Sequence, residues 1–219
     1  MTDGPSIPPP PPPASSSNLI SRVLGLVTNP AGEWQKIDGE STTLVKLVTT
    51  YTMILAAILP IAFILGGLLM GGGRGIGTLV IIALIYYAFH VIVPVALSFV
   101  IDLLAPNFGT AKNATQAAKL AIYSATPTHL AGILFLLASN MFGGLQWLPV
   151  LIGLGWGGYL LFLGLPILMR TPADKVPAFA GVSVGAWAVL WVIAQMIINT
   201  LVWNIVFSAL YSAAGMGRF

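Results

Sequence analysis

The chain has 219 residues, of which 57% are hydrophobic and only 7% are charged, and its formal net charge is +3. Soluble domains carry about 25% charged residues, so this composition excludes an ordinary soluble protein. The small, scattered positive charge gives no reason to expect a nucleic-acid partner. Because the chain contains no cysteine, disulfides, thiolate nucleophiles and cysteine-based metal sites are excluded as well.

Residues 1–17 form a separate N-terminal segment. It contains the unbroken proline run Pro8–Pro13, which is followed by an alanine and three serines. Such a tract predicts a disordered tail with polyproline II character. The alternative is a tract that binds an aromatic groove on a partner.

Residues 18–43 are predicted to form amphipathic helices at the membrane interface. Asn18 is a good helix cap, and the apolar residues that follow it at helical spacing are Leu19, Ile20, Val23, Leu24 and Val27. Asn29 and Pro30 predict the start of a second helix. In that helix, Trp34 is expected either to anchor at the lipid headgroups or to pack on the ends of the spans.

Five long apolar segments follow, and nearly every charge lies between them. The segments are Leu44–Met70, Ile76–Leu104, Leu120–Ala138, Leu145–Met169 and Ala178–Leu210. Each approaches or exceeds the roughly 20 apolar residues that cross a bilayer as one helix. The sequence therefore predicts an all-α fold, a polytopic transmembrane helix bundle with five spans over residues 44–213.

The distribution of lysine and arginine predicts the orientation of this bundle. With the N-terminus in the cytoplasm, the basic residues on the inner side are Arg22, Lys36, Lys46, Lys112, Lys119, Arg170 and Lys175. Only Arg74 and Arg218 then lie outside, together with the loops Gly71–Gly77 and Ser139–Gly144. Positive residues favour the cytoplasmic side, so we predict a multi-pass protein of the inner (cytoplasmic) membrane, with its N-terminus cytoplasmic and its C-terminus outside.

Two histidines lie inside the predicted spans. His90 and His129 fall near the centres of the second and third spans, which are antiparallel, so their imidazoles are expected at a similar depth. Pro94 and Pro127 each remove a backbone donor and thereby free the carbonyls of His90 and Tyr123. The pattern predicts either a polar midplane site for a proton relay or a ligand, or structural hydrogen bonds between helices. Two histidines alone are too few for a closed zinc site.

Further polar groups lie within or at the end of a span. Gln195 and Asn199 are four residues apart on the last span and share a face, so they are candidates for the same midplane site or for interhelical hydrogen bonds. Asp102 ends the second span close to Lys112 and Lys119, with either of which it could pair, and its expected role is structural or orienting rather than catalytic.

Two glycine pairs, Gly153 with Gly157 and Gly181 with Gly185, have the spacing that lets helices approach closely. We expect them to pack within the bundle, with a homodimer contact as the alternative.

No catalytic constellation is visible in the sequence. It lacks a phosphate-binding loop, an H-E-x-x-H metal motif and a G-x-S-x-G nucleophile motif. We therefore predict no enzyme activity, no metal and no cofactor.

Several stretches resemble a known family. They are Asn29–Ile37, Phe108–Gly109, Lys119–Pro127, Ala131–Gly132 and Tyr159–Lys175, of which the pieces Tyr-x-x-Thr-Pro and Gly-Leu-Pro-x-Leu-Met-x-x-Pro are the most specific. Over about residues 29–200 the chain resembles a bacterial member of the Yip family, the five-span proteins named after Ypt-interacting proteins. The cytoplasmic-face residues that we single out, all but the first within these motifs, are Asp102, Tyr123, Thr126, Pro127, Gly164, Pro166, Arg170, Pro172 and Lys175.

The resemblance and the basic inner loops imply a non-enzymatic scaffold or adaptor. Its expected partners are membrane lipid headgroups, other membrane proteins or a second copy of itself, bound on the cytoplasmic side. The alternative is a small transporter, channel or lipid-handling protein that uses the polar midplane site.

Overall fold

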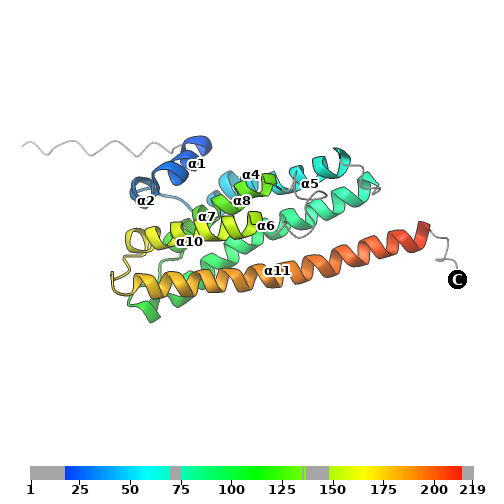
Figure 1. Cartoon of the computed structure of the whole chain (residues 1–219). Helices are drawn as coiled ribbons and strands as arrows, with labels where there is room; N and C mark the ends of the chain where they lie inside the picture. The colour runs from blue at the N-terminus through cyan, green and yellow to red at the C-terminus, as the bar shows by residue number, and fades with distance from the viewer. Residues whose placement is uncertain (1–17, 70–74, 135, 137–147, 214–219) are drawn as a thin grey trace, which may run out of the picture.

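The computed structural model describes residues 18–69, 75–134, 136 and 148–213, with the side chains of the last segment described from residue 150 to residue 207. Every regular element within these ranges is a helix (Figure 1). The proline-rich tail 1–17, the loop 139–144 and most of the Gly71–Gly77 loop lie outside the described residues, so the predictions for them stay untested.

Two short helices precede the first span, as the caps predict. Helix α1 (Leu19–Thr28) begins where the Asn18 side chain accepts a hydrogen bond from the Ser21 amide at 2.8 Å. Helix α2 (Pro30–Asp38) begins with proline, and the Asn29 side chain accepts from the Gly32 amide at 3.2 Å. Proline suits this first position because its missing N–H has no acceptor there in any case.

The first span is helical but irregular, with a turn at Ala57 between two helices. It consists of α3 (Leu44–Leu47), the π-helical turn η1 (Val48–Thr52), α4 (Met53–Ala56) and α5 (Ile58–Leu69). Thr43 caps its start by accepting from the Lys46 amide at 3.2 Å. Single π-helical turns inside α-helices are rare, and those that occur often lie at functional sites.

The second span is the long helix α6 (Ile76–Leu104), which tightens into the 3₁₀ turn η2 (Ala105–Phe108). Pro106 lies in that turn, and Gly109 follows it with a positive φ of 70°. Glycine is the residue that adopts this left-handed conformation without steric cost, so Gly109 ends the helix.

The third predicted span, Leu120–Ala138, is not one straight helix in the described region. The chain forms α7 (Ala114–Ser124), α8 (Thr126–Ala131) and the short 3₁₀ turn η3 (Gly132–Leu134), and most of the remainder lies outside the described residues. Pro127 explains the break, because a proline inside a helix removes one hydrogen bond and clashes with the preceding turn.

The last two long helices are α10 (Leu148–Leu168) and α11 (Val176–Ala213). Between them, Arg170 adopts a positive φ of 55°, which is uncommon for a residue other than glycine. Helix α11 extends well past its neighbours toward the C-terminus (Figure 1).

Within the described residues, four helical segments are long and apolar enough to cross a membrane. They are Leu44–Leu69, Ile76–Phe108, Val150–Leu168 and Val176–Phe207. The chain is therefore an all-α, multi-pass membrane protein. The broken α7–α8 segment packs between these helices, with α7 against α6 and α10, and α8 against α10.

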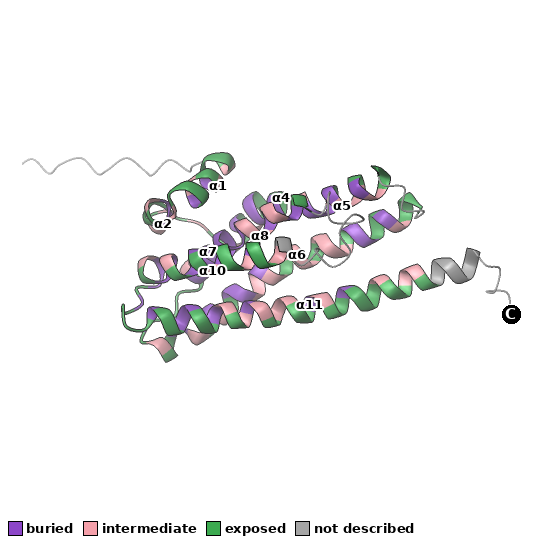
Figure 2. Ribbon diagram, in the orientation of Figure 1, coloured by how far each residue is buried: buried purple, intermediate pink, exposed green. Residues whose placement is uncertain are grey.

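The buried residues concentrate at one end of the bundle. This is the end where α6 and α10 finish, α11 begins, and α1 and α2 are docked (Figures 1 and 2). The largest fully buried side chains of the described residues include Trp34, Phe179 and Trp187. Trp34 is fully buried. Of the two roles predicted for it, packing against the spans is therefore correct and anchoring at the lipid headgroups is not.

The two glycine pairs behave differently. A Cβ atom on Gly153 would lie 2.6 Å from the Thr128 Cα, and one on Gly157 would lie 2.6 Å from the Ser124 carbonyl oxygen. This pair therefore packs within the bundle, as predicted. Gly181 and Gly185 on α11 have open space where a Cβ would be, so the expected packing of this second pair within the chain is wrong.

Candidate functional site

The motif residues Tyr123, Thr126 and Pro127 meet at the break between α7 and α8. Pro127 cannot donate to the Tyr123 carbonyl, and the Thr126 hydroxyl donates to that oxygen instead, at 2.6 Å. Because the Thr126 hydrogen is used there, the Tyr51 hydroxyl donates to the Thr126 oxygen at 2.7 Å. The break is therefore hydrogen-bonded to the first span, and Thr126 is fully buried.

The ring of Tyr123 is the centre of an aromatic cluster. The Tyr51 ring lies edge-on at 4.7 Å between centroids, and the Trp34 ring lies edge-on at 6.4 Å. Gly164 makes room for this cluster, since a Cβ on it would lie 2.4 Å from Leu120 and 3.0 Å from Trp34. The sequence singled out Tyr123 and Gly164, and the structure brings both against Trp34.

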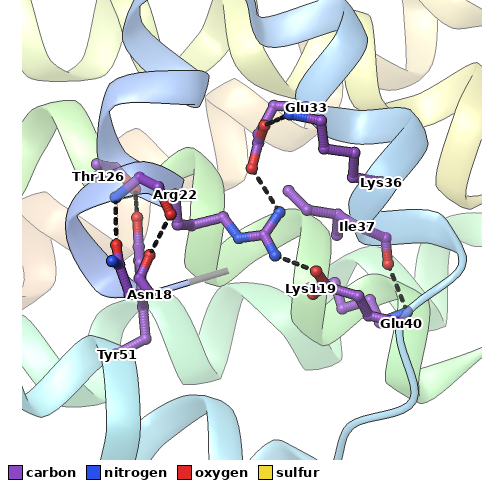
Figure 3. A network of polar contacts seen from close by, with 10 residues as sticks. Asn18, Arg22, Glu33, Lys36, Ile37, Glu40, Tyr51, Lys119 and Thr126 are labelled. Atoms are coloured by element: carbon purple, nitrogen blue, oxygen red, sulfur yellow. Dashed lines mark hydrogen bonds and ion pairs between the residues drawn. The ribbon is translucent and has the colours of Figure 1, made fainter. Parts of the chain in front are cut away.

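A buried ion-pair network lies beside this cluster (Figure 3). The Arg22 guanidinium donates to Glu33 at 2.7 Å and to Glu40, and Arg22 and Glu33 are only 3% and 2% exposed. Lys36 adds a second cation on Glu33 at 2.9 Å. The Arg22 guanidinium also lies over the Tyr123 ring, 5.3 Å from its centroid. We predicted no role for Arg22 beyond its inner-side charge, so this network is a feature that sequence reasoning missed.

The end of α2 is tied to α7 and to the loop after α10. The Lys119 ammonium donates to the Ile37 carbonyl at 2.9 Å and to the Asp38 carbonyl at 3.3 Å. The Asp38 carboxylate accepts from Gln116 at 3.1 Å and from Arg170 at 2.6 Å. Burial lowers the pKa of Lys119 from its ordinary value, an effect that the nearby Asp38 charge partly offsets.

The remaining cytoplasmic-face candidates are less connected. Pro172 lies close to Gly109, whose Cβ position is 3.7 Å from the Pro172 ring. Pro166 is exposed on α10, and the exposed side chain of Lys175 pairs with Asp174 at 3.5 Å.

Asp102 corrects one prediction. Among the described residues it pairs with neither Lys112 nor Lys119, because Lys119 points to the backbone of α2 and Lys112 is exposed. One Asp102 carboxylate oxygen is buried without a hydrogen-bond partner.

The midplane candidates His90, His129 and Gln195 do come together. All three line one small cavity between α6, α8 and α11, and the two imidazole centroids are 6.0 Å apart. The cavity has a volume of ≈ 20 Å³, which is room for about one water molecule. Asn199 is exposed and does not line it, so it does not share the surroundings of Gln195.

The hydrogen bonding in this cavity is incomplete. The His90 Nδ1 donates to the carbonyl of Tyr86 on its own helix at 3.0 Å. His129 is only 2% exposed, yet both of its ring nitrogens lack partners, as does the Thr128 hydroxyl in the same wall. The sequence analysis did not single out Thr128. Its position beside His129, directly after Pro127, was the signal that could have identified it as a polar group of this cavity.

Metal binding has little support from the described side chains. Within them, no group of three or more histidine, cysteine, aspartate or glutamate residues is arranged to hold an ion. The cavity histidines could bind one ion only with ligands from elsewhere.

Comparison with known proteins identifies the family to which this chain belongs. Residues 24–194 match the Yip1 domain, which is well over half of the chain. "Inner membrane protein YohC" from Escherichia coli strain K12 is 27% identical over 196 residues, covering 84% of this chain and 97% of that protein. The protein of the same description from E. coli O6:H1 gives the same figures. No solved structure matches. Together with its apolar helices, these matches make the chain a multi-pass inner membrane protein that belongs to the Yip1 family.

Proposed function

We propose that this protein is a non-enzymatic scaffold or adaptor, which binds other membrane proteins or lipid headgroups through its cytoplasmic face. The observation that carries the proposal is the way in which α1 is docked. Arg22 and Leu26 face the protein and are buried, whereas Ile20, Leu24 and Val27 are 68%, 56% and 41% exposed. These three side chains lie at i, i+4 and i+7, so they form one apolar stripe on a rigidly held helix.

Exposed cations surround the same end of the bundle. The side chains of Lys36, Arg170 and Lys175 are 70%, 69% and 54% exposed. Basic groups near the cytoplasmic leaflet gain roughly 1 kcal/mol each from anionic lipids. An apolar stripe bordered by cations suits a membrane surface or the inner end of another membrane protein.

The scaffold proposal predicts a specific contact on α1. A photoreactive amino acid at Val27 in living membranes is expected to give one discrete protein adduct, which disappears when Ile20→Ser interrupts the stripe. The control position is Val189, which is 58% exposed on α11 and should give no such adduct. Equal adducts at Val27 and Val189, or an adduct that survives Ile20→Ser, would contradict the proposal.

The five-span topology, with the N-terminus in the cytoplasm, is part of the same proposal. It needs the α7–α8 segment to belong to a fifth crossing, because the four long helices alone would return the C-terminus to the cytoplasm. We expect alkaline phosphatase fused to Phe219 to be active and green fluorescent protein fused there to stay dark. The reverse pattern would mean an even number of crossings.

A second candidate function, a small transporter or channel, is favoured by the cavity that His90, His129 and Gln195 line. Ionisable groups inside a membrane commonly mark proton pathways. In this case, purified protein in liposomes should raise proton flux, measured with an internal pH dye. His129→Phe should abolish that flux, whereas the exposed control Asn199→Leu should leave it unchanged. A flux equal to that of empty liposomes would eliminate this candidate.

A further inference from the structure

An apolar groove runs along the side of the bundle, between the start of the first span and α6. Its volume is ≈ 540 Å³, and its walls come from α3, η1 and the second half of α6. Leu44 and Val48 form one side, and Ile92 and Phe99 form part of the other. Since both walls belong to helices that can cross the membrane, the groove opens toward lipid.

A smaller hollow adjoins the inner end of this groove. It has a volume of ≈ 80 Å³ and shares Leu44 and Phe99 with the groove, so the two adjoin at these side chains. Its other walls are Ser98, Asp102 and the first residues of α7. The groove is thus lined mainly by carbon and ends at a carboxylate.

The carboxylate of Asp102 lines the smaller hollow. One of its oxygens is buried without a hydrogen-bond partner, and none of the ion pairs in the described chain includes it. The neighbouring Ser98 hydroxyl donates to the Val95 carbonyl at 2.6 Å, so it does not supply the missing donor. A buried carboxylate oxygen is costly to leave unsatisfied, which favours a cationic donor from outside the protein.

We propose that this groove binds one phospholipid with a primary ammonium headgroup, with an acyl chain between η1 and α6 and the ammonium on Asp102. The apolar walls select hydrocarbon, and the charge of the carboxylate selects an amine over a purely anionic headgroup. The phosphate of the same lipid would lie toward the start of α7, where the Asn113 side chain already accepts from the Gln116 amide at 3.1 Å and the two amides before it have no intrahelical acceptor. Exposed Lys112 lies two residues before that helix and carries the matching charge for the phosphate.

This lipid site goes beyond the proposed scaffold function, because it lies on different elements from the α1 stripe. The two proposals therefore fail separately. Loss of the Val27 adduct would leave the lipid site untouched, and loss of lipid selectivity would leave the adduct untouched.

The test is native mass spectrometry of the full chain released from nanodiscs that contain equal amounts of phosphatidylethanolamine and phosphatidylglycerol. The wild-type protein is expected to retain one phosphatidylethanolamine preferentially. Asp102→Asn should lower that preference about tenfold, because a charge-assisted hydrogen bond is replaced by a neutral one. Asp174→Asn, whose side chain is 71% exposed, is the matched control and should keep the preference.

A second variant tests the groove itself. Ala96 is one of the groove residues, and Ala96→Phe should fill the space and reduce retention of the lipid without changing any charge. A wild-type protein that retains both lipids equally, or an Asp102→Asn protein that keeps the preference, would show ordinary boundary lipid and overturn the proposal. The unfolding midpoint of each variant shows whether the protein remains folded. Because Ala96→Phe changes no charge, it tests whether the lipid occupies the groove independently of the charge on Asp102.

Discussion

Arg22→Met is expected to lower the free energy of unfolding by about 3–5 kcal/mol, because it leaves Glu33 and Glu40 without their shared partner. The guanidinium is almost fully enclosed, so water cannot replace it. Lys36 remains beside Glu33 but is largely exposed, and it contacts Oε2 of that carboxylate whereas Arg22 contacts Oε1. The measurement is SDS-titrated unfolding in mixed micelles, which gives a free energy for each variant.

Two variants make this result specific to the network. Lys36→Met removes an exposed partner of the same glutamate and is expected to cost only about 0–1 kcal/mol. The double variant Arg22→Met with Glu33→Gln should lose less than the sum of the single changes, because the almost fully buried Arg22–Glu33 pair is then removed from both sides and only the partly exposed Glu40 keeps an unpaired charge. If Arg22→Met costs no more than Lys36→Met, the buried network does not stabilise the protein.

Gly157→Ala is expected to destabilise the bundle by about 1–3 kcal/mol, as overpacking in a tight core does. The added methyl would lie 2.6 Å from the Ser124 carbonyl oxygen and 2.6 Å from the Trp187 ring. A backbone carbonyl cannot turn aside as a side chain can, so α10 must move away from α7. Trp187 also lines the cavity of His90 and His129, so this movement should disturb that site as well.

The matched control is Gly155→Ala, two residues earlier on the same helix. Nothing lies within 4 Å of its Cβ position, so the change should be neutral or stabilise the helix by up to about 1 kcal/mol. The same unfolding titration compares the two variants. Equal stabilities would mean that α7 and α10 do not approach as closely as this structure has them.

The sequence allowed the long apolar helices, the two capped helices before them and the meeting of His90 with His129 to be predicted. All of these depend on local signals, namely apolar length, cap residues and antiparallel neighbours. The motif residues Tyr123, Thr126 and Gly164 were singled out through a resemblance. Their hydrogen bonds and contacts could be assigned only in three dimensions.

The partners of two charged groups on α1 and α6 were missed or assigned wrongly, for a shared physical reason. The sequence analysis assigned Arg22 no partner, yet Arg22 is buried against Glu33 while Ile20 and Leu24 are exposed. Asp102 was assigned to Lys112 or Lys119, but Lys119 donates to the backbone of α2. Periodicity identifies a face, but the partner of a charged group depends on residues far away in the chain, such as Glu33 for Arg22.

The docking of α2 has a consequence for how the protein is synthesised. Asp38 is held by Arg170, which lies 132 positions later in the chain, and Trp34 packs where Gly164 leaves room. A ribosome that has released the first helices has not yet made the residues against which they pack. Helices α1 and α2 must therefore wait until the fourth predicted span is inserted, so they are translated early and are among the last elements to pack.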